Sequence, residues 1–285
     1  MRSSRSRAPI WCSPSSAWGP NSRRGCSACW SSRTTRDYAG ASLKRRLGAA
    51  LAHFGSASLS QLQHALLHEP AVFGKLLDFF TVQVSDMFRD PAYFAALREQ
   101  VLPLLRTYPS PRIWVAGCST GEEAYSFAVL LREEGLLAKS RIYATDINPN
   151  ALQTARDGTY DIDRMAGFTE NHRLAGGRGS LSEHYTAAYG RAIFDQALKQ
   201  RIVFSDHSLT TDAVFAEVQF VSCRNVLIYF NRALQDRAIG LFHEALCRKG
   251  FLGIGSRESL RFSSHAASFD KIDRDNRILR RKETP

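Results

Sequence analysis

No stretch of 18 consecutive apolar residues occurs in the sequence, so no segment is predicted to span a membrane. The basic N-terminus is not followed by an apolar stretch, and no secretory signal is expected. Neither the dinucleotide fingerprint G-x-G-x-x-G nor a Walker loop is present. Cys26 and Cys29 could form half of a zinc site, but no second Cys or His pair follows at suitable spacing. These absences predict a cytoplasmic protein that holds no metal.

The composition is that of a globular protein with a basic tail. The chain has 285 residues, of which 44% are hydrophobic and 11% aromatic, enough to bury a large core. Its net charge of +11 would suit nucleic-acid binding, but residues 1–36 contain seven arginines and no acid. Removing those seven charges leaves +4, an ordinary value for a soluble domain. We therefore expect a disordered Ser/Arg-rich tail over residues 1–36 and no nucleic-acid partner.

A helical N-terminal domain is predicted over residues 37–84. Apolar residues recur at helical spacing from Leu43 to Phe54, and residues 58–67 and 71–80 predict two further helices. One side of the first helix is basic. The residues of this basic face are Lys44, Arg45 and Arg46.

Strand and helix signals alternate after residue 85, which predicts an α/β fold. Asp90-Pro91 is typical of a helix start, with Asp90 as N-cap and the helix continuing to about Leu105. The alternation favours a Rossmann-like, doubly wound, mainly parallel sheet over residues 85–285, interrupted by an inserted small β-subdomain at about 158–200. Strands are expected at 112–116, 141–145, 201–205, 218–223 and 250–255, with a closing edge strand at 277–280. Helices are expected at 121–134, 149–156 and 232–247.

A glycine turn and a carboxylate follow the first two predicted strands. The turn Gly117–Gly121 comes directly after the strand at 112–116, and Asp146 ends the next strand. Glycine lets the backbone approach a ligand closely, and a carboxylate at a strand tip can accept hydrogen bonds from ribose hydroxyls. The two features together predict a nucleoside site.

Two other interpretations of these residues stay open at this point. Gly117–Gly121 also matches the G-x-S-x-G nucleophile elbow of hydrolases, for which His243 or His265 could supply a base. Only helices precede the turn and no His-Gly-Gly motif is visible, which argues against a hydrolase. Asp146 could instead be the N-cap of a helix that starts at Pro149.

Three further segments are candidates for the same site. Glu122 and Glu123 lie in the first turn of a helix, where carboxylates complement the dipole, and we favour Glu122 as the ligand contact. Arg89, in the cluster 85–91, could pair with a ligand carboxylate, cap a helix or bridge the two domains. Residues 221–230 follow a third apolar strand and could form a pocket floor or simply pack.

Taken together, these segments resemble the CheR family of S-adenosylmethionine-dependent glutamate O-methyltransferases of bacterial chemotaxis receptors. The resemblance covers residues 37–282 and rests on motifs in the family's order. They are Asp37–Leu47, Met87–Pro91, Ala116–Glu123, Ala144–Ile147 and Cys223–Phe230.

The resemblance implies a class I methyltransferase domain behind a receptor-facing helical domain. It implies S-adenosylmethionine as cofactor, S-adenosylhomocysteine as product, and chemoreceptor cytoplasmic helices as partners, with a receptor C-terminal tether peptide as a possible further partner. Lys44, Arg45 and Arg46 would bind the acidic receptor helices. The implied cofactor contacts are Gln83, Ser85, Arg89, Glu122, Asp146, Ser208, Leu209, Asn225 and Val226.

The implied chemistry needs few catalytic groups. A glutamate has a reference pKa of about 4.3, so the acceptor is already a carboxylate at neutral pH and requires neither a general base nor a metal. Tyr229 is the candidate for orienting that carboxylate. The Asn/Asp-Pro-Pro-Tyr signature that resembles amine-directed methyltransferases is missing at 222–226, which argues against methylation of a base nitrogen.

Several positions depart from the family pattern. Gln83 and Ser85 stand where Asn and Thr are usual, Ser208 stands where Asn is usual, and Ala124 replaces a common Pro. Gln83 and Ser208 motivate an alternative function, a signalling scaffold that binds S-adenosylmethionine without turnover. The basic composition motivates another, an RNA methyltransferase.

Overall fold

A computed structural model of the chain describes residues 40–69, 72, 75–76, 78–79 and 85–283. The predicted tail at 1–36 and Gln83 lie outside these residues, as do the side chains of Lys44 and Arg45. The division into domains at residues 36/37 and 84/85 therefore stays a prediction.

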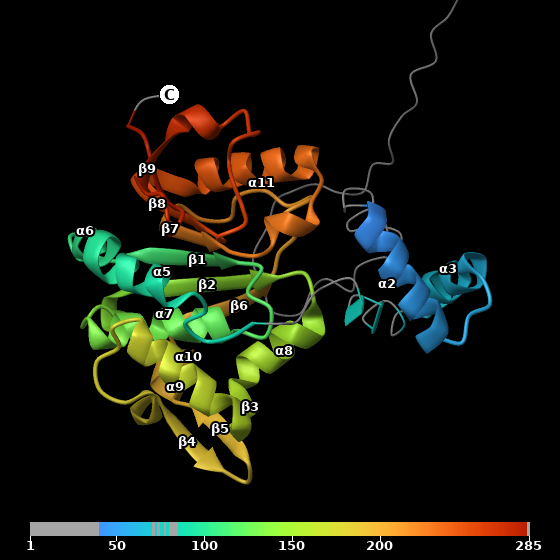
Figure 1. Ribbon diagram of the computed structural model, residues 1–285, viewed down its shortest axis with the longest axis horizontal. Coiled ribbons are helices and arrows are strands. Elements are labelled where there is room, and N and C mark those ends of the chain that lie inside the picture. Colours follow the sequence, from blue (N-terminus) through green and yellow to red (C-terminus); the bar gives the residue numbers. More distant parts are fainter. Residues whose placement is uncertain (1–39, 70–71, 73–74, 77, 80–84, 284–285) are drawn as a thin grey trace, which may run out of the picture.

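A mostly parallel seven-stranded sheet forms the centre of the molecule, in the order β6-β2-β1-β7-β8-β10-β9 (Figure 1). The first five strands in this order are parallel, and β10 is antiparallel to both of its neighbours. This confirms the predicted doubly wound α/β class. The strands are β1 (Arg112–Ala116), β2 (Arg141–Asp146), β6 (Ile202–Asp206), β7 (Val218–Cys223), β8 (Leu246–Ile254), β9 (Phe269–Asp273) and β10 (Ile278–Arg281).

The predicted closing edge strand at 277–280 is wrong in its position. That segment is β10, which lies between β8 and β9, and β9 is the edge. Only Phe269 of β9 is buried, so this strand has too few apolar residues to be recognised by pattern. β8 also begins earlier than expected, at Leu246, directly after a helix.

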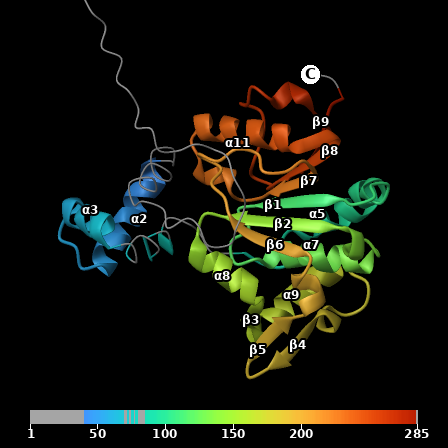
Figure 2. The same ribbon diagram turned by 180° about the vertical axis from the view of Figure 1, so that it is seen from behind.

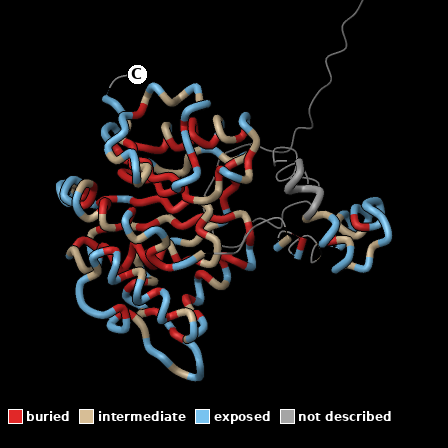
Figure 3. The backbone as a smooth tube through the Cα atoms, in the orientation of Figure 1, coloured by how far each residue is buried: buried red, intermediate tan, exposed pale blue. Residues whose placement is uncertain are grey.

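Alternating side chains of the central strand supply two hydrophobic cores. Ile113 and Val115 point into the core on one face of the sheet, while Trp114 and Ala116 belong to the core on the other. This follows from the two-residue period of a strand that is buried on both faces. Figure 3 shows the buried backbone concentrated in the sheet.

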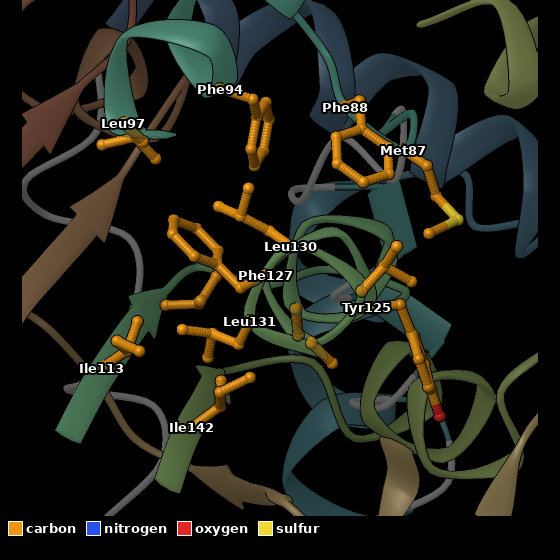
Figure 4. Close-up of a cluster of buried hydrophobic side chains, with 14 of the residues drawn as sticks. Met87, Phe88, Phe94, Leu97, Ile113, Tyr125, Phe127, Leu130, Leu131 and Ile142 are labelled. Carbon is orange, nitrogen blue, oxygen red and sulfur yellow. The ribbon is translucent and has the colours of Figure 1, made fainter. Parts of the chain in front are cut away.

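Helices cover both faces of the sheet. α7 (Glu122–Glu133) and α5 (Pro91–Ala96) contribute to the first core, part of which Figure 4 shows around Phe127 and Leu130. α11 (Arg232–Ala245) packs on the second core, where the ring centroids of Phe242 and Trp114 lie 5.3 Å apart. In both Figures 1 and 2 strands β7, β1 and β2 lie between α11 and α7.

The segment predicted as one helix from Asp90 to Leu105 is interrupted. α5 is followed by a π-helical turn, η1 (Leu97–Val101), and then by α6 (Leu102–Leu105). Asp90 precedes the helix as expected, but its side chain makes no cap hydrogen bond and its φ is 57°. Asp90 therefore takes the predicted N-cap position before Pro91, but its carboxylate pairs with Arg224 and does not cap the helix.

A small antiparallel sheet, in the order β3-β5-β4, follows α8 (Pro149–Asp157) and lies within the segment predicted to hold an inserted subdomain. Helix α9 (Met165–Leu174) packs with this sheet into the core beneath α7. The other elements of this part are β3 (Thr159–Asp161), η3 (Ile162–Arg164), η4 (Leu181–His184), β4 (Tyr185–Ala188), β5 (Arg191–Phe194) and α10 (Gln196–Lys199); η2 (Leu137–Lys139) precedes β2.

Two helices precede the sheet in the described N-terminal part, α2 (Gly40–His53) and α3 (Leu59–His68). The described residues between 72 and 79 are also helical, as predicted. Asp78 accepts hydrogen bonds from the side chains of Asn148, at 2.8 Å, and Asn150, at 3.1 Å, at the start of α8. These bonds connect the N-terminal helices to the end of β2. None of the helices described is long and apolar enough to span a membrane.

Candidate functional site

The glycine turn after β1 is shaped by close backbone packing. The N–H groups of Gly117 and Cys118 both donate to the carbonyl of Thr145, at 2.8 and 2.9 Å, which fastens the turn to the end of β2. Gly117 has a φ of 73°, and a Cβ built there would lie 2.4 Å from Cγ2 of Val226. The turn therefore requires glycine on two grounds, its backbone conformation and its approach to the loop after β7.

Asp146 is buried at the end of β2 and faces this turn. Its Oδ2 accepts the Ser119 N–H at 2.8 Å and its Oδ1 accepts the Asn148 N–H at 2.9 Å. Burial raises the pKa of Asp146, and the backbone N–H groups oppose that rise. The N-cap of α8 is Asn148, whose side chain accepts from Asn150 and Ala151, so the interpretation of Asp146 as the cap is wrong.

Glu122 and Glu123 differ in their surroundings. Glu122 is fully buried, and it accepts bonds from the Thr120 hydroxyl at 2.7 and 2.8 Å and from Arg164 at 2.9 Å. Burial raises the pKa of Glu122, while Thr120 and Arg164 oppose the rise. Glu123 instead accepts from the Ser222 hydroxyl, at 2.6 Å, and from Arg224, in contacts that join α7 to β7.

The loop that carries Arg89 is held in an unusual conformation. Phe88 and Asp90 both have positive φ, at 50° and 57°, a region that costs non-glycine residues energy. Arg224 donates to the Arg89 carbonyl at 2.9 Å and to the Asp90 carboxylate at 2.6 Å, and the Ser126 hydroxyl accepts the Phe88 N–H at 2.8 Å. These contacts fix the backbone on both sides of Arg89, so Arg89 is presented from a rigid loop.

The loop after β7 is organised by a buried carboxylate that the sequence interpretation missed. Glu258 accepts the N–H groups of Gly255 at 2.6 Å, Asn225 at 3.1 Å and Ile228 at 3.3 Å. Burial raises the pKa of Glu258, opposed by these backbone donors. Asn225 has a φ of 61°, and its N–H group is bound by Glu258, which therefore stabilises the bend at this residue.

Tyr229 meets the basic helix at this same loop. The Arg46 guanidinium lies over the Tyr229 ring, 5.0 Å from its centroid. This distance is within the range of a cation–π interaction. Arg46 of α2, predicted to bind the receptor helix, is therefore in contact with Tyr229 of η5 (Leu227–Tyr229), which is predicted to orient the acceptor carboxylate.

Ser208 and Leu209 lie beyond the end of β6. The Ser208 N–H donates to Asp212 at 3.0 Å, and its hydroxyl bonds with the Thr210 hydroxyl at 2.7 Å. Leu209 belongs to the core that packs on Trp114. Ser208 is therefore part of an internally bonded turn at the same edge of the sheet as Asp146.

The structure thus gathers most of the predicted cofactor contacts at the carboxyl ends of neighbouring parallel strands. Glu122 and Asp146 follow β1 and end β2, Asn225 and Val226 follow β7, and Ser208 follows β6. Such an edge is where α/β sheets bind their ligands. Sequence reasoning missed four residues that support this edge. Thr120 lies in the glycine turn itself and Arg224 directly follows β7, whereas Arg164 and Glu258 reach the edge from distant segments.

This donor set fits an adenosyl cofactor with an amino-acid end. A carboxylate offers about four acceptor positions, so Asp146 can accept ribose hydroxyls in addition to its backbone donors. Glu122 can accept an ammonium group, and the missing Cβ of Gly117 lets Val226, another predicted cofactor contact, pack directly against the turn. Among the described residues, no three His, Cys, Asp or Glu side chains are grouped as metal ligands.

Gly117→Ala is expected to weaken S-adenosylhomocysteine binding about 10- to 100-fold, because the methyl group would push Val226 or the turn out of place. Gly135→Ala is the matched control, since Gly135 also has a positive φ, of 67°, but has nothing within 4 Å of its Cβ position. Both variants should lose about 1–2 kcal/mol of stability from backbone strain. Calorimetric titration and urea unfolding measure the two effects. Equal affinities in the two variants would contradict a role for the close approach.

As the pH falls, S-adenosylhomocysteine binding is expected to weaken at a higher pH than it would if the carboxyl groups of the site had ordinary pKa values. The folded-state pKa values of Asp146 and Glu122 are raised from 3.8 and 4.5 by burial, so their carboxylates are protonated earlier as the pH falls. A raised folded-state pKa also means that protonating these groups favours folding, so affinity should fall without unfolding from this source. Titrations from about pH 8 to about pH 5 test this. A Glu122→Gln variant that kept the full pH dependence would exclude Glu122 as a source of the effect.

Comparison with known proteins identifies related sequences. Residues 83–278 match the family described as CheR methyltransferase, SAM binding domain. The putative methyltransferase Cher3 of Pseudomonas putida is 56% identical over 246 residues, which cover 86% of this chain and 90% of that protein. A chemotaxis protein methyltransferase of Listeria monocytogenes is 30% identical over 223 residues, covering 76% and 81%.

Solved structures also match, among them the S-adenosylmethionine-bound amino pentose methyltransferase CalS10 of Micromonospora echinaspora. Its TM-score is 0.35 at 16% identity, and the match covers 66% of this chain and 55% of that one. The family match favours a methyltransferase turn over a nucleophile elbow at Gly117–Gly121. The family match also confirms the resemblance to the CheR family that the sequence motifs indicated.

Proposed function

The chain belongs to the CheR family of methyltransferases, and from this premise we propose that it methylates glutamate side chains of chemoreceptors. The proposed products are glutamyl methyl esters on the receptors' cytoplasmic helices, which would set adaptation in chemotaxis-type signalling. The observation that carries the proposal is the pair of buried carboxylates, Glu122 and Asp146, beside the glycine turn, with Arg46 and Tyr229 at the loop after β7.

Bound S-adenosylmethionine would supply an activated methyl group on a sulfonium centre. Asp146 would bind the ribose hydroxyls and Glu122 the ammonium of the amino-acid end. Asn225 and Val226, on the loop braced by Glu258, would border the adenosyl group, together with Ser208 and Leu209. Ser85 and Arg89 would close the amino-acid end, and Gln83 is proposed for the same role.

The acceptor glutamate arrives as a carboxylate, because its reference pKa of about 4.3 lies well below neutral pH. The protein therefore needs to position this group and partly desolvate it rather than deprotonate it. Tyr229 would orient the carboxylate through its hydroxyl. Arg46 lies on the Tyr229 ring and would attract the acidic receptor helix, as would Lys44 and Arg45 on the same helix.

We also propose roles for the remaining parts of the chain. Residues 37–84 would face the receptor. The inserted segment 158–200 would dock a receptor tether peptide, an idea supported by β4, which pairs only with β5 among the strands described. The protein would act in the cytoplasm, where the receptor's signalling helices lie.

Methyl-labelled S-adenosylmethionine and purified receptor cytoplasmic fragments test the proposal. The expected result is label on the receptor that mild alkali releases as methanol, since a methyl ester is base-labile. A fragment with its acceptor glutamates changed to glutamine is the matched control and should take up no label. Label that survives alkali would point to amine or carbon methylation. S-Adenosylhomocysteine binding without transfer to any fragment would favour the non-catalytic scaffold.

A further inference from the structure

Arg164 brings a guanidinium group to the predicted amino-acid end of the site. It comes from η3, in the inserted part of the chain, and its Nη1 donates to Oε1 of Glu122 at 2.9 Å. Its Nη2 donates to the Ser85 carbonyl and lies 3.4 Å from Oδ1 of Asp86. Arg164 therefore joins Glu122 to the loop that carries Ser85 and Arg89, two predicted contacts of the cofactor.

The guanidinium is also held by an aromatic platform. It lies over the Phe168 ring, 4.7 Å from the centroid, and 6.0 Å from the centroid of Tyr160. Tyr160 in turn donates to the Thr120 carbonyl at 2.8 Å, inside the glycine turn. The position of Arg164 is therefore fixed by the same turn that positions Glu122, while about a third of its side chain, 37%, stays exposed.

An anion and a cation fixed side by side match a particular ligand chemistry. The α-amino-acid end of S-adenosylmethionine carries an ammonium and a carboxylate on one carbon atom. A protein that binds the ammonium with a carboxylate must therefore have a donor for the ligand carboxylate close by. A guanidinium presents five N–H donors in a planar fork suited to carboxylates, and the contacts described for Arg164 use two of its nitrogens.

We propose that Arg164 and Glu122 form a zwitterion-binding pair in which Arg164 binds the carboxylate of the cofactor's amino-acid end, alongside Arg89. This inference rests on the proposed cofactor and adds a specificity residue to it. The pair selects ligands that carry both charges and discriminates against adenosyl compounds that lack the carboxylate. Arg164 belongs to the inserted segment, so that segment contributes directly to cofactor binding.

Calorimetric titration of the full chain with three ligands tests the pair. The ligands are S-adenosylhomocysteine, its decarboxylated amine analogue and 5′-methylthioadenosine, which lacks both charged groups. In Arg164→Gln we expect S-adenosylhomocysteine to bind about 10- to 100-fold more weakly, while the two ligands without a carboxylate change by less than about threefold. Arg164→Lys should restore part of the loss, because it keeps the charge without the fork.

Arg173→Gln is the matched control, because Arg173 pairs with Glu170 on the exposed surface of α9 and should not affect any of the three affinities. Equal weakening of all three ligands in Arg164→Gln would show a merely structural role and overturn the proposal. Tighter binding of the amine-bearing ligands would show that Arg164 blocks Glu122, and would also overturn it. If the wild-type chain bound none of the three ligands, the proposed cofactor would be wrong. If Arg164→Gln bound all three ligands with the wild-type affinities, only the proposed role of the Arg164–Glu122 pair would be wrong.

Discussion

Asp146→Ala should reduce S-adenosylhomocysteine affinity by about 100-fold or more. Hydrogen bonds to a charged group contribute about 1.5–3 kcal/mol each, and Asp146 has acceptor positions for two ribose hydroxyls beyond its own backbone donors. Two such bonds correspond to a loss of at least about two orders of magnitude in affinity. The measurement is isothermal titration with S-adenosylhomocysteine.

Asp146 also fastens the glycine turn, so the variant must be shown to fold. Circular dichroism and a thermal melt test this, and Asp146→Asn retains one acceptor for the Ser119 or Asn148 N–H. Asp157→Ala, at the exposed end of the helix that follows β2, is the matched control and should bind normally. Unchanged affinity in a folded Asp146→Ala protein would remove Asp146 from the site.

Arg224→Met is expected to destabilise the protein by about 3–5 kcal/mol. Only 2% of the Arg224 side chain is exposed, and it pairs with Asp90 at 2.6 Å and with Glu123 at 3.1 Å. Its guanidinium also lies 4.1 Å from the centroid of Tyr93. Removing one partner of a buried ion pair leaves uncompensated charge, which accounts for a cost of this size.

Urea unfolding with a surface control measures this effect. Arg106→Met is matched in chemistry, but 57% of the Arg106 side chain is exposed and its contact with Glu134 is long, at 3.4 Å, so the cost should be below about 1 kcal/mol. Arg224→Lys should fall between the two, because it keeps the charge but cannot reach every partner. A loss below about 1 kcal/mol in Arg224→Met would contradict the view that Arg224 holds the strained loop at Phe88 and Asp90.

The sheet and its central motifs could be predicted because their signals are local. An apolar strand, a glycine turn and a strand-end acid can be read from neighbouring residues, and β1, β2 and β7 lie where the pattern expected them. β9 could not be recognised, since a strand with a single buried residue has no hydrophobic pattern to detect. The order of β9 and β10 at the edge depends on pairing between strands and not on either segment alone.

The supporting residues of the site could not be predicted for a related reason. Arg224 bonds with residues more than 100 positions away, and Glu258 caps a loop about 30 residues before it. Arg164 reaches Glu122 only because the inserted segment folds back against the glycine turn. Asp90 before Pro91 shows both cases, because the local signal predicts the helix start correctly but not the pairing of the Asp90 carboxylate with the buried Arg224.

A crystal structure of the chain with S-adenosylhomocysteine tests the central claim most directly. The account predicts the ligand at the carboxyl ends of β1, β2 and β7, with its ribose at Asp146 and its amino-acid end between Glu122 and Arg164. A ligand bound at another surface, or a complex in which neither Asp146 nor Glu122 touches it, would contradict the account.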